Sequence, residues 1–239
     1  TSDLKEAVKN SDIIFICVGR DQDLREVMEG DDGILSNSQD HCYIVDHTTA
    51  SANIAREFYD YCKDKNKHFL DAPISGGQAG AENGALTVMI GGDEDAFKKA
   101  SPVIDSYSKK MKLLGPAGNG QLAKMVNQIC IAGLLQGLSE AINFGQKVNL
   151  DMEKVIGVIK DGAASSWQMQ NRHQTMANNE FDFGFAVEWM RKDLKICLEQ
   201  ADKVGARLPV TAIIDQFYSN VLEIGGKRWD TSSLIKLLR

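Results

Sequence analysis

Strand-like and helical segments alternate along the first 115 residues, and this alternation constrains the fold more than any other feature. Short apolar runs typical of strands cover residues 12–18, 43–48, 67–74, 85–91 and 111–114. Helical patterns cover residues 2–9, 22–29, 51–64 and 93–109. Short β-branched strands separated by helices are typical of a mostly parallel, doubly wound sheet. The sequence therefore predicts an α/β domain built on such a sheet.

The pattern changes after Gly118. Helical segments follow one another at 119–147, 151–161, 167–178, 184–204 and 208–224, with no strand pattern between them. We therefore predict two domains, an α/β domain over residues 1–117 and an all-helical domain over residues 118–239.

The first residues of the chain have the pattern of the middle of an α/β domain. The segment TSDLKEAVKNSDIIFICVG has no initial methionine, and its capped helix leads directly into an apolar strand. We therefore expect the first part of the sheet domain to lie before Thr1.

Charge and hydropathy argue against two classes of partner. The chain has 239 residues, of which 43% are hydrophobic, and a formal net charge of -6. Phosphate binding depends on clustered Lys and Arg, and the sequence contains no such cluster, so we expect no nucleic-acid partner. The longest apolar runs are too short to span a bilayer, so we expect no membrane span.

The cysteines and histidines predict neither disulfides nor a metal site. The five cysteines are far apart and form no C-x-x-C pair, which favours buried thiols in a reducing compartment, and we predict a cytoplasmic protein. The four histidines show neither H-x-x-x-H nor H-E-x-x-H spacing, so we expect no bound metal.

A glycine cluster interrupts the strand pattern. The segment FLDAPISGGQAGAENGALTVMIGG (residues 69–92) holds six of the 21 glycines. Glycine in a strand costs stability, so the cluster indicates that backbone must approach something closely. If Ser75, Gly76 and Gly77 open a helical turn that runs to Glu82, their amide N–H groups point outward at the positive end of the turn. This arrangement predicts a binding seat for an anion such as a carboxylate.

The long helix after Gly120 carries three polar residues on an apolar background. GQLAKMVNQICIAGLLQGLSEAINFG is apolar over most of its circumference, which predicts a buried helix. Lys124, Asn127 and Gln128 stand at i, i+3 and i+4, so an amine and two amides share one face. Two interpretations remain open: a lysine that extends to solvent at a helix end, or a buried lysine that belongs to a site.

Three stretches together resemble one known family. DAPISGGQAGAENGALTVMIGG, GPAGNGQLAKMVNQ and FGFAVEWMRKDL, in this order, are similar to motifs of the β-hydroxyacid dehydrogenase family, typified by 3-hydroxyisobutyrate dehydrogenase and tartronate semialdehyde reductase. The resemblance covers essentially the whole chain. It implies a Rossmann-type sheet domain, here truncated at its N-terminus, followed by a helical domain for substrate binding and oligomerisation. It also implies an oxidoreductase that interconverts a short β-hydroxy acid and its semialdehyde.

The resemblance assigns the substrate side of the site. In the family, the segment corresponding to Ser75, Gly76 and Gly77 holds the substrate carboxylate. Lys124 corresponds to the general acid/base, and burial of a lysine lowers its pKa toward working pH. Asn127 resembles the amide that orients the substrate. Gln128 stands where many members have a second asparagine, a difference that bears on substrate choice.

The resemblance also implies NAD or NADP as cofactor. Val18 and Gly19 resemble the backbone that packs on the dinucleotide, and Thr49 matches a threonine near the nicotinamide. The pyrophosphate turn and the residue that distinguishes NAD from NADP would lie before Thr1, so the choice cannot be read here.

Residues of the helical domain are assigned in the same way. Phe185 and Lys192 match residues that close over the cofactor, whereas Asp193 is expected to hold its helix in place. Trp167 is either a wall of the substrate pocket or a core residue, and both interpretations stay open.

Three other functions fit the sequence less well. A 6-phosphogluconate dehydrogenase-like enzyme would need a histidine-asparagine pair and a glutamate acid where this chain has Asn127, Gln128 and Ile131. An imine reductase usually replaces the lysine that is present here as Lys124. A non-catalytic Rossmann-fold scaffold is the alternative from another class, and retention of Lys124 speaks against it. The long apolar helices predict a homodimer or homotetramer.

Overall fold

The computed structural model describes all 239 residues, which form two compact units, Thr1–Val126 and Asn127–Arg239. Helix α7 (Asn119–Lys147) begins in the first unit and continues into the second. Each unit has its own hydrophobic clusters.

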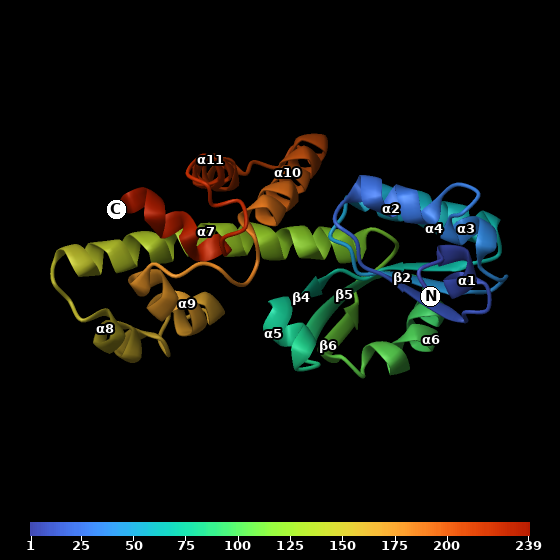
Figure 1. The fold of residues 1–239 in the computed structure, drawn as a ribbon, viewed down its shortest axis with the longest axis horizontal. Coiled ribbons are helices and arrows are strands. Elements are labelled where there is room, and N and C mark those ends of the chain that lie inside the picture. Colours follow the sequence, from blue (N-terminus) through green and yellow to red (C-terminus); the bar gives the residue numbers. More distant parts are fainter. The chain divides into compact units, whose positions relative to one another are not determined.

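The first unit is built on a six-stranded sheet (Figure 1). Three strands run parallel and in register, so that Ile13, Tyr43 and His68 stand side by side. β5 runs antiparallel to β3 and β4, and β6 runs parallel to β5. The strands are β1 (Ile13–Ile16), β2 (Tyr43–Asp46), β3 (His68–Asp71), β4 (Ile74–Ser75), β5 (Leu86–Gly92) and β6 (Ser108–Leu113).

Helices cover both faces of this sheet (Figure 1). On one face, Leu24, Ile34 and Phe58 pack with Ile14, Ile44 and other strand residues in one cluster. On the other face, α6 (Glu94–Ile104) packs against strand residues such as Val45 and Ile90. The helices of the first face are α1 (Leu4–Val8), α2 (Asp21–Met28), α3 (Ile34–Asn37) and α4 (Ala52–Asp64). The predicted α/β fold class, a doubly wound sheet followed by a helical domain, is confirmed.

Several predicted boundaries in this unit are wrong. The strand predicted over 67–74 is two strands, because the chain turns at Ala72 and Pro73 from β3 into β4. The helix predicted over 93–109 ends at Ile104, and the strand expected at 111–114 begins at Ser108. β6 pairs only with β5, and Lys109, Lys110 and Lys112 leave its outer positions exposed and charged. Such lysines are typical of an edge strand, and they hide the strand pattern in the sequence.

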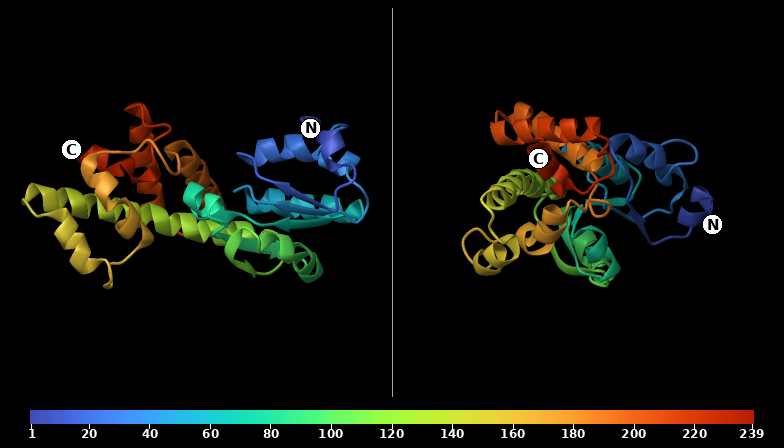
Figure 2. Two further views of the ribbon diagram at one scale, coloured as in Figure 1. Left: turned by 60° about the horizontal axis from the view of Figure 1, so that its bottom comes forward. Right: turned by 60° about the vertical axis from the view of Figure 1, so that its left-hand side comes forward.

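The second unit consists of helices arranged around α7 (Figure 2). Ala132 and Leu135 of α7 pack with α10 (Val187–Val204) and α11 (Pro209–Glu223) in one cluster. Leu138 and Ile142 pack with α8 (Met152–Ile159) and α9 (Trp167–Asn178) in the other. A closing 3₁₀ helix, η1 (Thr231–Leu238), contributes Leu234 to the first cluster and Ile235 to the second.

Two expectations about burial are corrected. Helix α7 is not buried all round, because Val126 and Phe144 are 63% and 65% exposed. All five cysteines are free, but Cys17 and Cys130 are exposed, so only Cys42, Cys62 and Cys197 are buried thiols. No helix of the protein has both the length and the apolar character that crossing a membrane requires.

Candidate active site

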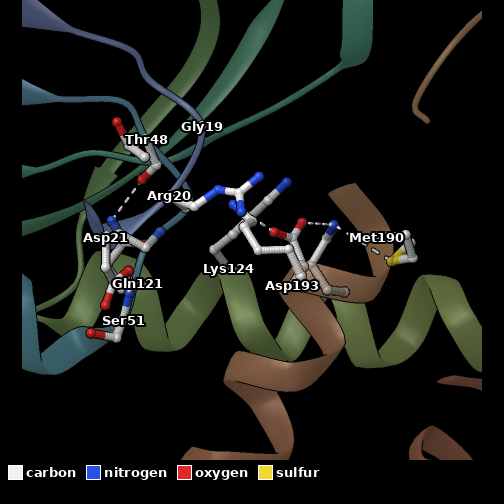
Figure 3. Close-up of polar contacts among 12 residues, drawn as sticks. Gly19, Arg20, Asp21, Thr48, Ser51, Gln121, Lys124, Met190 and Asp193 are labelled. Carbon is white, nitrogen blue, oxygen red and sulfur yellow. Dashed lines mark hydrogen bonds and ion pairs between the residues drawn. The ribbon is translucent and has the colours of Figure 1, made fainter. Parts of the chain in front are cut away.

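Two neighbouring strands of the first unit end in polar loops at the same edge of the sheet. Val18 and Gly19 follow β1, and Thr48 and Thr49 follow β2, which runs parallel to it. The Val18 amide donates to Thr48 Oγ1 over 3.0 Å, so the two loops are joined. Figure 3 shows Gly19 and Thr48 at this edge. The carboxyl edge of a parallel sheet is where open α/β folds bind their ligands.

The glycine cluster forms an exposed turn after β4. Gly76 and Gly77 have φ angles of +138° and +60°, in a region that favours glycine. α5 (Gly77–Glu82) starts here, as the sequence predicted for a helical turn. The amides of Gly76 and Gly77 donate no hydrogen bond within the protein. Two N–H groups without a partner in the protein therefore lie next to Ser75, and such donors suit an anion.

The Lys124 amine lies against the residue that precedes this turn. Its Nζ donates to the backbone oxygen of Ile74 over 2.8 Å, and the residue is 7% exposed. Lys124 therefore does not extend into solvent at the helix end, which was one of the two interpretations left open by the sequence. The amine is held one residue away from Ser75.

Asp71 attaches the start of α7 to the sheet. Its two carboxylate oxygens accept hydrogen bonds from the amides of Gly118 (2.7 Å) and Gln121 (2.9 Å). Burial raises the pKa of Asp71 to about 6, and these backbone donors work in the opposite direction. A carboxylate at this position caps the helix whose second turn carries Lys124.

Gln121 joins the same helix to the loop after β2. Its Oε1 accepts from the Ala50 amide (3.0 Å) and its Nε2 donates to the Thr48 backbone oxygen (2.8 Å). Figure 3 shows Gln121 and Thr48 together. Neither Asp71 nor Gln121 was among the site residues predicted from the sequence. The only signal for Asp71 is an acidic residue at the end of an apolar strand, and nothing in the sequence marks Gln121.

A second buried carboxyl group lies beside Asp71. Asp46 is the register partner of Asp71 on the neighbouring strand, and its Oδ1 accepts from the Thr48 amide over 2.9 Å. Burial raises the pKa of Asp46 to about 7. The loop that carries Thr48 and Thr49 is thus supported from both sides, by Asp46 and by Gln121.

In the second unit, the amides predicted for the substrate side form one hydrogen-bonded chain. Asn127 Nδ2 donates to Gln128 Oε1 (2.8 Å), and Gln128 Nε2 donates to Asp193 Oδ2 (2.7 Å). Lys192 Nζ lies 3.0 Å from Asp193 Oδ1. Figure 3 shows Asp193 on α10 together with Met190. Gln128 is buried, and within this unit its side-chain nitrogen is used in the hydrogen bond to Asp193.

The remaining predicted residues of the second unit surround Asp230. The Phe185 amide donates to Asp230 Oδ2 over 3.0 Å, and Arg172 Nε lies 3.5 Å from Asp230 Oδ1. The Arg172 guanidinium stacks over the rings of Trp167 (4.7 Å) and Phe183 (4.9 Å). Trp167 is 52% exposed, so it is not the core tryptophan that was one of its two interpretations.

The structure thus groups the predicted residues by unit. The first unit joins Val18 to the Thr48 loop and Lys124 to the strand before Ser75. The second joins Asn127 and Gln128 to Lys192 through Asp193, and relates Phe185 to Trp167 through Asp230 and Arg172. No group of three or more His, Cys, Asp or Glu side chains in residues 1–239 is arranged to hold a metal ion.

A doubly wound sheet with polar loops at its carboxyl edge, followed by a helical unit, is typical of two-domain dinucleotide-binding oxidoreductases. Family comparisons agree with this class. The NAD binding domain of 6-phosphogluconate dehydrogenase matches residues 1–115, and the NAD-binding domain of NADP-dependent 3-hydroxyisobutyrate dehydrogenase matches residues 118–238.

Individual relatives cover nearly the whole chain. An uncharacterized oxidoreductase of Shewanella frigidimarina is 57% identical over 98% of this chain and 80% of its own length. The 2-hydroxy-3-oxopropionate reductase of Escherichia coli is 32% identical over the same shares. The structure of Mycobacterium tuberculosis 3-hydroxyisobutyrate dehydrogenase with L-serine superposes with a TM-score of 0.87 at 27% identity, covering 98% of this chain and 82% of that one. The chain belongs to the 3-hydroxyisobutyrate dehydrogenase-like β-hydroxyacid dehydrogenase family of NAD(P)-dependent oxidoreductases.

Proposed function

We propose that this protein interconverts a short, 3-hydroxyisobutyrate-like β-hydroxy acid and its semialdehyde, with Lys124 as general acid/base and NAD or NADP as cofactor. One observation carries the proposal: the Lys124 amine is held 2.8 Å from the Ile74 oxygen, next to the turn whose free amides suit a carboxylate. A carboxylate seat beside a buried amine fits a substrate that bears an acid group and a nearby carbonyl or alcohol.

We place the nicotinamide of the cofactor at the carboxyl edge of the sheet in the first unit. After β1, Gly19 brings bare backbone to the carboxyl edge, and the Val18–Thr48 hydrogen bond fixes the adjoining loops. We propose that Val18, Gly19 and Thr49 contact the nicotinamide side of the cofactor, and that Phe185 and Lys192 cover it. The bound nicotinamide supplies or accepts the hydride at the substrate carbon.

The chain's own residues handle the proton and the orientation of the substrate. In reduction, Lys124 Nζ gives a proton to the carbonyl oxygen, so that the aldehyde becomes an alcohol; in oxidation, the neutral amine removes the hydroxyl proton. Ser75, Gly76 and Gly77 hold the carboxylate with one hydroxyl and two amide donors. Asn127 orients the substrate oxygen, and Gln128 and Trp167 shape the pocket.

We further propose that residues 1–117 form the cofactor-binding domain and that residues 118–239 form the domain for substrate binding and oligomerisation, in a homodimer or homotetramer. The cytoplasmic location stays a prediction. The support for an oligomer is a set of exposed apolar side chains in the second unit, among them Phe144, Val158 and Val210.

A substrate panel tests the proposal. The full-length protein would be assayed with semialdehydes and β-hydroxy acids that carry methyl, hydroxyl or hydrogen at C2, each with NADH and NADPH or their oxidised forms. We expect turnover of at least one acid and loss of turnover when its carboxylate is replaced by an amide. Absence of turnover throughout, with the cofactor bound, would instead favour the non-catalytic scaffold, and CO₂ release from a sugar acid would favour the 6-phosphogluconate dehydrogenase-like alternative.

A further inference from the structure

The side chain of Gln121 makes two hydrogen bonds to one loop, on either side of a single residue. Its amide accepts from Ala50 N and donates to Thr48 O, so its two partners are the residues before and after Thr49. The side chain is fully buried. Both polar ends of one amide are therefore used to fix the backbone that presents Thr49.

The backbone of Gln121 is fixed as well. Its amide N–H donates to Asp71 Oδ2, and Asp71 Oδ1 accepts from Gly118. A side chain at Gly120 would overlap the Asp71 carboxylate and the Met89 backbone oxygen, so α7 starts in close contact with the sheet. The position of Gln121 is therefore fixed by its contacts with the sheet. The loop around Thr49 is then held in place by the Gln121 side chain.

Lys124 lies one turn further along the same helix, three residues from Gln121. One helical turn thus separates Gln121, which fixes the Thr49 loop, from Lys124, whose amine donates to the Ile74 oxygen. We propose that Gln121 is a positioning residue, which sets the distance between the loop that presents Thr49 to the cofactor and the turn that carries Lys124. This inference rests on the proposed function of these two residues.

We expect Gln121 to affect the rate more than substrate binding. Hydride and proton transfer require the cofactor at the Thr49 loop and the Lys124 amine to be correctly placed relative to each other. Displacement of a reacting group by about 1 Å costs on the order of 100-fold in rate. In the full-length enzyme, Gln121→Leu should lower kcat by about 10- to 100-fold and weaken NAD(P)H affinity, with little change in the KM of the hydroxy acid. The Ala50 amide should exchange its hydrogen faster.

Lys67→Met is a matched control. Lys67 Nζ is also buried and also donates to two backbone oxygens, those of Ser38 (2.7 Å) and Gln39 (3.1 Å). It lies just before β3, at the opposite end of the sheet. This variant loses a comparable pair of buried hydrogen bonds, so its melting temperature should fall in a similar way while kcat stays that of the parent.

Gln121→Glu provides a readout that a purely structural role would not move. A protonated carboxyl group has the shape of the amide and can donate to Thr48 O, whereas the carboxylate cannot and would oppose that oxygen. The variant should therefore keep much of the parent's kcat at low pH and lose it as pH rises. Burial favours the protonated form. Asp71 accepts from the Gln121 backbone amide, and Asp46 accepts from the Thr48 amide. Further charged groups around the loop and the helix start are Asp21, which accepts from Ser51 N, Arg56, which donates to Ala117 O, and Lys124 on the same helix.

Three results would overturn the inference: a parent-like kcat in Gln121→Leu, an equal fall of kcat in Lys67→Met, or a Gln121→Glu profile parallel to that of the parent. If the parent turns over no substrate, the proposed function fails and the inference is decided by NAD(P)H affinity and Ala50 exchange. Unchanged affinity and exchange in Gln121→Leu would then reject it, and a loss of both would support it.

Discussion

The amine of Lys124 donates to the backbone oxygen of Ile74 across 2.8 Å, which ties the second turn of α7 to the strand that ends at Ser75. The two residues are far apart in sequence, and the contact depends on Asp71, which caps α7 at the end of β3. In the sheet, β5 lies between β3 and β4. The sheet thereby brings together a buried amine and a turn whose amides have no partner within the protein.

Replacement of Lys124 by alanine tests the role of this amine. Because a positioned acid or base contributes roughly 10²- to 10⁴-fold to a rate, Lys124→Ala should lower kcat by that amount while the fold is retained. The measurement is steady-state turnover of the best substrate, with circular dichroism to verify folding. Lys112→Ala, at an exposed lysine of β6, is the control and should leave kcat unchanged. Near-normal turnover in Lys124→Ala would sink the mechanism.

The turn at Ser75 should determine the preference for a free acid. Ser75→Ala removes one hydroxyl donor and leaves the amides, so we expect a loss of about 1 to 3 kcal/mol in the free energy derived from kcat/KM. Gly76→Val should act more strongly, because φ is +138° and an added Cβ would lie 3.1 Å from Leu86 Cδ2. Both variants should show a smaller difference in kcat/KM between an acid and its methyl ester than the parent does. An unchanged difference in folded variants would mean that the carboxylate binds elsewhere.

The sequence predicted the bounds of two helices of the second half of the chain closely, although it placed the end of α6 too late. Helices α7 (Asn119–Lys147) and α9 (Trp167–Asn178) start and end where expected. For α9, Ser166 accepts from the Met169 amide at one end and Asn179 adopts a left-handed conformation at the other. Such capping signals are local in sequence, so they are readable without knowledge of the fold.

Contacts between distant segments were not readable in this way. Asp71 and Gln121 are 50 residues apart, and Thr48 and Gln121 are 73 apart. Nothing in the sequence distinguishes these three residues from other polar residues, because their partners come close only when the sheet forms. The same holds for β6, whose lysines suit an edge strand but conceal the alternation that marks a strand. The motifs identified residues for a site, whereas the contacts that hold them required the structure.

Asp46 should make the stability of the protein depend on pH. Burial raises its pKa to about 7 from an ordinary 3.8, so the folded protein holds this proton more tightly than the unfolded chain does. Its contribution to the free energy of unfolding is therefore present at low pH and is lost as pH rises from about 4 to about 7, with a slope of up to about 1.4 kcal/mol per pH unit.

Asp46→Asn removes this slope, because the amide oxygen still accepts from the Thr48 amide but does not titrate. Urea unfolding at several pH values between 4 and 8 measures the effect. The variant should lose less stability than the parent over this interval, whereas Asp60→Asn, at an exposed carboxylate, should follow the parent. Parallel curves for the parent and Asp46→Asn would show that Asp46 titrates normally.

The exposed apolar residues of the second unit predict association. Val158, Phe144 and Val210 are 81%, 65% and 60% exposed, and apolar side chains in such numbers are usually covered in an oligomer. Sedimentation velocity of the full-length protein at micromolar concentration should give the mass of a dimer or a tetramer. A single species with the mass of one chain would reject the proposed oligomer.

The Asp230 carboxylate lies against Gly184, in the segment before α10. Gly184 and Gly205 both have a φ of +72°, so alanine at either position meets the same backbone penalty, roughly 1 to 2 kcal/mol. Only at Gly184 would the new Cβ overlap a neighbour, the Asp230 carboxylate, whereas nothing lies within 4 Å of a Cβ at Gly205. We expect Gly184→Ala to lower the free energy of unfolding by about 1 to 3 kcal/mol more than Gly205→Ala does. Since Asp230 also accepts from the Phe185 amide, Gly184→Ala should weaken NAD(P)H binding as well, and Gly205→Ala should not. Urea unfolding and a cofactor titration of the two variants measure both effects, and equal losses in the pair would show that the carboxylate moves aside at no cost.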